Sequence, residues 1–102
     1  MKIAVASEGK DENAQVSAVS GRAPYYLIFE DGKLIKTLSN PFKVGGGGAG
    51  LGVAQMLGNE GVNVIISGKF GSNMQTMCDE KNIKVKVVEG RTAREAVDEV
   101  KE

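Results

Sequence analysis

Apolar residues along this chain occur in short runs that polar or glycine-containing segments separate. Short runs rich in Val, Ile, Tyr and Phe are typical of strands, and runs without polar alternation indicate strands covered on both faces. The pattern predicts five strands, at residues 1–6, 25–30, 33–38, 63–67 and 83–88.

Two of these strands form the clearest local unit, a hairpin. The segments YYLIFE and KLIKTL flank Asp31 and Gly32, a dipeptide that tolerates the positive φ angles of a type I′ turn. Side chains alternate along a strand, so we expect Leu34 and Leu38 on one face of the sheet and Ile35 on the other.

Three segments carry apolar positions at helical spacing; they cover residues 49–59, about 72–81, and the segment after Thr92. Ser72 or Asn73 is expected to cap the second helix, and the T-A-R-E run from Thr92 to Glu95 predicts a capping box for the third. Strands that alternate with helices predict parallel crossovers. Together with the hairpin, they predict an α/β fold with a five-stranded mixed sheet and about three helices.

The composition fits a single domain over residues 1–102 and removes several classes of function. The net charge is zero and the lysines are scattered, which argues against a nucleic-acid partner. No apolar run approaches the ~20 residues of a membrane-spanning helix. The only cysteine is Cys78, and a lone thiol suits a reducing cytosol, so we expect a cytoplasmic protein.

The chain has no histidine, which removes the commonest general base and the commonest transition-metal ligand. Nucleophilic triads need such a base. A two-metal nuclease needs clustered carboxylates that typically begin with an Asp on the first strand, and residues 1–6 contain none. We therefore expect a binding protein and not an enzyme.

Residues 43–52 read KVGGGGAGLG. The tract matches G-x-G-x-x-G, but no strand leads directly into it, and the acidic residue that dinucleotide-binding loops carry about 20 positions later is missing. A phosphate-binding P-loop fails as well, because Val53 and Ala54 stand where Lys and Ser or Thr belong. The remaining interpretations are a mobile connection, or an anion-binding flap whose amides at Gly47, Gly48 and Gly50 would face a ligand.

A second candidate segment runs from Ser67 to Asn73, at the carboxyl end of an expected parallel strand and the start of a helix. Ligands of open α/β sheets bind outside such strand ends. Gly68 and Gly71 would let the backbone approach a ligand, and amides near Asn73 would receive an anion. We expect this segment and the glycine tract to close over one crevice.

Arg22 and Cys78 carry the most informative candidate chemistry. A guanidinium clamps carboxylates, phosphates or anionic clusters bidentately, although Arg22 could instead pair with a nearby acid. Ser17 and Ser20 are candidate hydrogen-bond partners beside it. Cys78 is the only soft metal ligand, and the alternative is a small buried core residue. One thiol gives too few ligands for a cluster, which would need its own sulfides, external ligands or a second chain.

The combined motifs resemble those of a known family: MKIAVAS, Val16-Ser17-x-x-x-Gly21-Arg22-Ala23 before PYYLIF, Asn40-Pro41, the glycine tract into GLGVAQML, GVNVIISGKFGSN and IKVKVVEG. Over essentially the whole chain, this pattern resembles the dinitrogenase iron–molybdenum cofactor biosynthesis family. The resemblance implies a ribonuclease H-like fold and the binding or carriage of iron–sulfur or iron–molybdenum clusters. The family commonly has Ser-Pro-His-Phe-Gly-Arg where this chain reads SAVSGR, so Val19 stands at the histidine position.

We therefore expect a small binding or carrier protein for an iron–sulfur or iron–molybdenum type metallocluster, or for its precursor. Loop amides, Arg22 and Cys78 would hold this anionic ligand. Expected protein partners are cofactor-assembly proteins or a second copy in a homodimer. Two alternatives stay open: a metal-free interaction or regulatory module on the same scaffold, and a nucleotide-binding module that uses the glycine tract.

Overall fold

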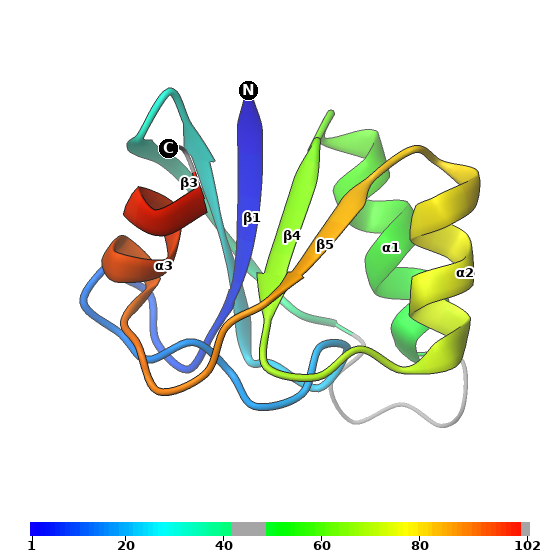
Figure 1. Ribbon diagram of the computed structural model, residues 1–102, viewed down its shortest axis with the longest axis horizontal. Coiled ribbons are helices and arrows are strands. Elements are labelled where there is room, and N and C mark those ends of the chain that lie inside the picture. Colours follow the sequence, from blue (N-terminus) through cyan, green and yellow to red (C-terminus); the bar gives the residue numbers. More distant parts are fainter. Residues whose placement is uncertain (42–48, 101–102) are drawn as a thin grey trace.

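The computed structural model describes residues 1–41 and 49–100, with backbone only for 49–51. Its elements, in chain order, are β1 (Lys2–Ser7), β2 (Tyr25–Glu30), β3 (Lys33–Ser39), α1 (Ala49–Asn59), β4 (Val64–Ser67), α2 (Ser72–Glu80), β5 (Lys84–Val87) and α3 (Ala93–Val100) (Figure 1). Each lies within one or two residues of the segment that the hydrophobic pattern predicts. Among the described residues, no helix is both long and apolar enough to cross a membrane.

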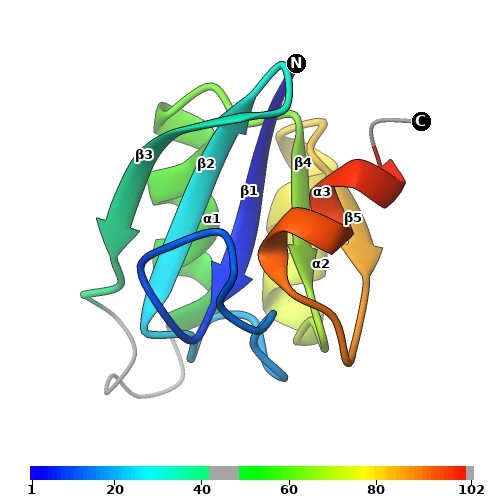
Figure 2. The same ribbon diagram turned by 90° about the vertical axis from the view of Figure 1, so that its left-hand side faces the viewer.

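The strands form one mixed sheet in the order β3-β2-β1-β4-β5. β1 pairs antiparallel with β2 and parallel with β4, while β2–β3 is antiparallel and β4–β5 is parallel. α1 and α2 cover one face and α3 covers part of the other, which gives three layers (Figure 2). The predicted α/β fold, with its mixed sheet, hairpin and three helices, is confirmed, and the arrangement is compatible with a ribonuclease H-like fold.

Both faces of the central strands are buried, which explains their uninterrupted apolar sequences. In β1, Ala4 and Ala6 pack toward α1 and α2, whereas Ile3 and Val5 pack toward α3. Burial of Ile3 and of Val5 each contributes roughly 1.5–3 kcal/mol to the free energy of unfolding, and each of the two smaller alanines contributes less. The first strand therefore holds both layers of helices to the sheet.

The hairpin turn has the predicted chemistry. Asp31 and Gly32 have φ angles of 51° and 84°. Positive φ at both central positions matches the type I′ turn, whose twist suits paired strands. The left-handed region favours Gly and tolerates Asp, so this dipeptide fixes where β2 ends and β3 begins.

One prediction for the hairpin is wrong: Leu34 and Leu38 lie on opposite faces. The register shifts beside Phe29, which opposes Leu34, while the preceding β2 residue opposes Lys36, so Ile35 is an extra residue in β3. Leu34 consequently packs on the α3 side and Leu38 on the side of α1 and α2. A bulge of this kind reverses the alternation beyond it.

The two predicted helix caps have different outcomes. In α3 the capping box is present: the Thr92 amide donates to Glu95 Oε1 at 2.9 Å, and the Glu95 amide donates to Thr92 Oγ1 at 3.2 Å. In α2 neither Ser72 nor Asn73 is the cap, because Gly71 holds the N-cap position with φ −72° and ψ 157° and no side chain caps the helix. The prediction for α2 placed the cap too late in the chain.

Candidate functional site

Two loops meet at the carboxyl ends of β1 and β4, along the lower edge of Figure 1. One leads from β1 to β2 and the other leads from β4 into α2. The Gly68 amide donates to the Ser17 carbonyl at 2.8 Å, and the Ser20 amide donates to the Lys69 carbonyl at 2.7 Å. Val19 and Lys69 form a parallel bridge between these bonds. The two loops are therefore joined as a short strand pair.

Gly68 makes this contact possible. A Cβ at this position would lie 2.8 Å from the Ala18 Cα, so any larger residue would push the loops apart. The sequence predicts that the small size of Gly68 lets a ligand approach the backbone. In the structure, the backbone of Ala18 occupies this space. At Gly71 a Cβ would meet nothing within 4 Å, so this glycine borders open space.

Ser17 and Ser67 are buried beneath the joined loops. The Ser17 hydroxyl donates to Glu8 Oε2 at 2.5 Å, and the Ser67 hydroxyl donates to the Ser17 carbonyl at 3.4 Å. Both hydroxyls are thus used within the protein, where they fix the two loops. Their predicted contact with a ligand stays a prediction.

Tyr26 and Asn40 hold the turn that carries Arg22, a role that no local pattern in the sequence indicates for either residue. The Gly21 amide donates to the Tyr26 hydroxyl at 2.8 Å. The Asn40 side-chain amide donates to the carbonyls of Gly21 and Ala23, at 3.0 and 2.8 Å. Gly21 has a φ of 93°, which only glycine adopts without strain. The only sequence signal was the polar Asn40 directly before a proline.

Three exposed side chains gather on the joined loops: Val19, Arg22 and Lys69, which we call the cationic loop surface. Val19 is 43% exposed and bridges to Lys69, and the Arg22 amide donates to the Val19 carbonyl at 3.4 Å. With the described residues, neither the guanidinium nor the lysine ammonium forms an ion pair or hydrogen bond. The alternative interpretation of Arg22, a partner acid, is therefore not seen in this part of the chain.

The start of α2 adjoins this surface, because Lys69 and Gly71 lie in the same short loop. First-turn amides of a helix have no intrahelical partner, and the positive end of the helix dipole lies there. No side chain caps α2, and Ser72 and Asn73 are exposed. The surface therefore combines two cationic side chains with the electropositive end of a helix.

Cys78 lies in the core and not on this surface. Its side chain is fully buried with Met74, whose sulfur accepts a hydrogen bond from the Ser20 hydroxyl at 2.9 Å. Burial raises the pKa of the Cys78 thiol, and the Asp79 carboxylate raises it further. A metal would have to displace packed side chains to reach this thiol, so the geometry favours a core residue.

The described residues contain no group of three or more His, Cys, Asp or Glu side chains that would hold a metal ion. Gly47 and Gly48 lie outside the described residues, and Gly50 lies in the first turn of α1. The predicted crevice between the glycine tract and the segment from Ser67 to Asn73 therefore stays a prediction. What the structure brings together is that segment and the turn around Arg22.

Comparisons with known proteins show relatives of this fold. The apo form of the orange protein from Desulfovibrio gigas is 28% identical, with a TM-score of 0.91 over 97% of this chain and 85% of that chain. A putative NifB protein from Thermotoga is 29% identical, with a TM-score of 0.82 over 98% and 86%. A putative dinitrogenase from Methanocaldococcus jannaschii, at 20% identity and a TM-score of 0.63 over 95% and 84%, shows the fold alone.

No curated protein matches this chain. The model of the family described as "Dinitrogenase iron-molybdenum cofactor" matches residues 1–102, which is the full length given. This agrees with the resemblance carried by the sequence motifs. The chain belongs to the dinitrogenase iron–molybdenum cofactor family.

Proposed function

We propose that this protein binds and carries an iron–sulfur or iron–molybdenum type metallocluster, or a precursor of one, on the cationic loop surface. Membership of the family supports a role connected with metalloclusters. The proposed site rests on one observation. Two loops that are hydrogen-bonded to each other hold Arg22 and Lys69 near the start of α2. Both side chains are exposed.

The chain's own residues determine how such a cargo would be held. With no histidine and a buried Cys78, the protein offers no imidazole and, in the described residues, no accessible thiolate as a metal ligand. The cluster therefore brings its own sulfide ligands and binds as an anion. A guanidinium donates bidentate, charge-assisted hydrogen bonds to anions, and helix-start amides add further donors.

The same residues favour carriage without chemical change. Arginine and lysine side chains are protonated at neutral pH, so they stabilise negative charge but do not accept protons. Ser17 and Ser67 are buried and hydrogen-bonded, and they offer no activated nucleophile. We propose that the protein keeps its cargo soluble until a cofactor-assembly partner receives it, and that it is not an enzyme.

Anaerobic reconstitution of the full chain with iron, molybdate and sulfide tests this function. After desalting, the wild type should retain charge-transfer absorbance. Arg22→Ala and Lys69→Ala should each weaken retention about tenfold or more, because a hydrogen bond to a charged group contributes roughly 1.5–3 kcal/mol. Lys33→Ala is the matched control, since it removes an exposed lysine beside the hairpin turn, at the opposite end of the sheet.

Three results would contradict the proposal. Retention that survives both substitutions but disappears in Cys78→Ala would place the cluster on the thiol. No retention by the wild type, together with a dimer in sedimentation, would favour a metal-free interaction module. Thermal stabilisation by a nucleotide instead of a cluster would favour a nucleotide site.

A further inference from the structure

β5 forms one edge of the sheet, and its outward-facing backbone is regular. The Lys84 amide donates to the Asn63 carbonyl and the Val88 amide donates to the Ser67 carbonyl, both at 3.0 Å. In a parallel pair such inward bonds come from alternate residues. The N–H and C=O groups of Val85 and Val87 therefore point away from β4, as hydrogen-bonding groups for a further strand.

The side chains of β5 divide by charge between the two faces. Lys84 opposes Val64 and Lys86 opposes Ile66, and both of these β4 residues belong to the core on the α3 side. The lysines are exposed there, and no described residue pairs with either ammonium. Val87, which alternates with them, turns to the other face and is 62% exposed.

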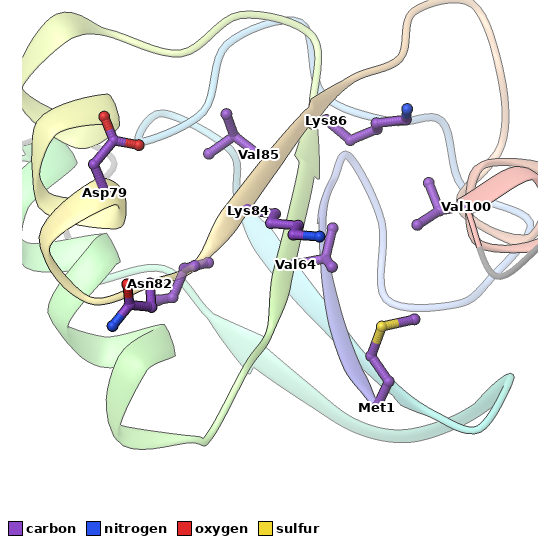
Figure 3. A pocket seen from close by; sticks show the side chains of 9 residues that line it. Met1, Val64, Asp79, Asn82, Lys84, Val85, Lys86 and Val100 are labelled. Carbon is purple, nitrogen blue, oxygen red and sulfur yellow. The ribbon is translucent and has the colours of Figure 1, made fainter.

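A groove follows this edge because α3 covers only part of its face. Its volume is about 720 Å³, within the range of ligand-binding clefts. Figure 3 shows Lys84, Lys86, Val64, Val100 and Met1 around the space between β5 and α3, with Asp79 and Val85 on the side of α2. The groove is thus apolar at its base and basic along β5.

We propose that β5 and this groove bind an extended segment of a partner protein in which acidic and apolar residues alternate. Such a segment would add a sixth strand and use the free main-chain groups of Val85 and Val87. Its acidic side chains would lie beside Lys84 and Lys86, and its apolar side chains beside the valines. Cross-strand pairs of opposite charge and of apolar side chains both stabilise strand pairing.

The same features disfavour two other arrangements. A second copy paired through β5 would bring Lys84 and Lys86 against the same lysines, and like charges across a strand pair are destabilising. None of the strands in the described ranges alternates acidic with apolar residues, so none of them in a second copy matches the proposed segment. The opposite edge, β3, is interrupted by the extra residue Ile35, and its Lys36 pairs with Glu60 at 3.0 Å.

Fluorescence anisotropy with labelled eight-residue peptides of Glu-Val, Glu-Ile and Asp-Leu repeats tests the proposal on the full chain without metal. At least one acidic peptide should bind the wild type. Its Gln-for-Glu or Asn-for-Asp analogue should have a dissociation constant that is higher by about tenfold or more. The double variant Lys84→Glu/Lys86→Glu should lose the acidic peptide and gain a Lys-Val peptide. That gain would also show that the variant is folded.

Two further variants locate the contact. Val87→Pro removes one outward N–H without removing a bond to β4, and it should weaken acidic-peptide binding. Lys33→Glu, on the β3 edge, should leave binding unchanged. The proposal is overturned if no acidic peptide binds, if Lys33→Glu weakens binding as much as the β5 double variant, or if β5 instead mediates self-association that Val87→Pro abolishes in sedimentation. None of these outcomes depends on whether a metallocluster binds.

Discussion

Gly68 and Gly71 belong to the same short loop, yet they meet different surroundings. A side chain at Gly68 would collide with the Ala18 backbone, whereas a side chain at Gly71 would enter open space. Gly71 also has φ and ψ angles that any residue adopts. The joined loops, and with them the spacing of Arg22 and Lys69, therefore depend on the first glycine and not on the second.

Gly68→Ala should lower the free energy of unfolding by about 1–3 kcal/mol, the usual cost of forcing a methyl group into a packed site. Gly71→Ala should change it by about 1 kcal/mol or less, because a small loss at the helix cap is offset by reduced freedom of the unfolded chain. Urea denaturation of both variants measures the difference. Equal effects would mean that the contact between Gly68 and Ala18 yields freely.

Val19 shows how one residue changes the chemistry of a surface. The resemblance places a histidine of the family at this position, and the structure places Val19 in the open, bridged to Lys69 and next to the turn of Arg22. On the proposed cationic loop surface, a histidine at this position would add an exposed imidazole. In this chain the same position offers only apolar contact, so under the proposed function the cationic groups and backbone amides would supply the binding energy.

The start and the orientation of α3 follow from its local sequence. Its two-way cap between Thr92 and Glu95 forms as predicted, and Ala93, Ala96 and Val97 are buried on the face toward the sheet. Hydrogen bonding to the Thr92 amide and hydroxyl also lowers the pKa of the Glu95 carboxyl. Cap and apolar face together set both where the helix begins and how it is oriented.

Thr92→Ala should lower the free energy of unfolding by about 1 kcal/mol, because removing the Thr92 hydroxyl leaves the Glu95 amide without its hydrogen-bond acceptor. For a domain of this size, the melting temperature should fall by roughly 4–8 °C. Thr76→Ala is a matched control: Thr76 is exposed within α2 and its hydroxyl only donates to the Ser72 carbonyl at 3.0 Å. Calorimetry that gave the control the larger shift would contradict the role of the capping box.

At the scale of the molecule, Arg94 joins three separate parts of the chain. From α3, its guanidinium donates to Glu12 Oε1 at 2.9 Å and to the Gly32 carbonyl at 2.8 Å. It also donates to Asp98 at 3.1 Å and lies 5.3 Å from the centre of the Phe29 ring. The loop after β1, the hairpin turn and α3 are thereby held together over one face of the sheet.

Arg94→Ala should lower the free energy of unfolding by about 2 kcal/mol, since it removes several charge-assisted hydrogen bonds from a partly buried site. Arg91→Ala breaks a single pair with Glu99 at 2.8 Å, with both side chains half exposed, and should cost less than ~1 kcal/mol. Urea unfolding at neutral pH compares the two variants. If Arg91→Ala lowered the free energy of unfolding as much as Arg94→Ala, the hydrogen-bond network around Arg94 would not contribute more than a single surface ion pair.

Local sequence is enough to predict the hairpin turn, the strands and helices, the cap of α3 and the mixed α/β sheet. Periodicity, turn chemistry and capping act over a few neighbouring residues, so a linear reading contains them. The sequence also marks Arg22 and the segment from Ser67 to Asn73 as candidates, although as separate features.

Which of these features meet depends on how the chain packs in three dimensions. This packing joined the loops through Gly68 and buried Ser17 and Cys78. It also placed Tyr26 and Asn40 behind the turn of Arg22, and an extra residue in β3 reversed the faces of Leu34 and Leu38. Each of these outcomes depends on packing between residues far apart in the chain or on different strands, and no local pattern specifies such contacts.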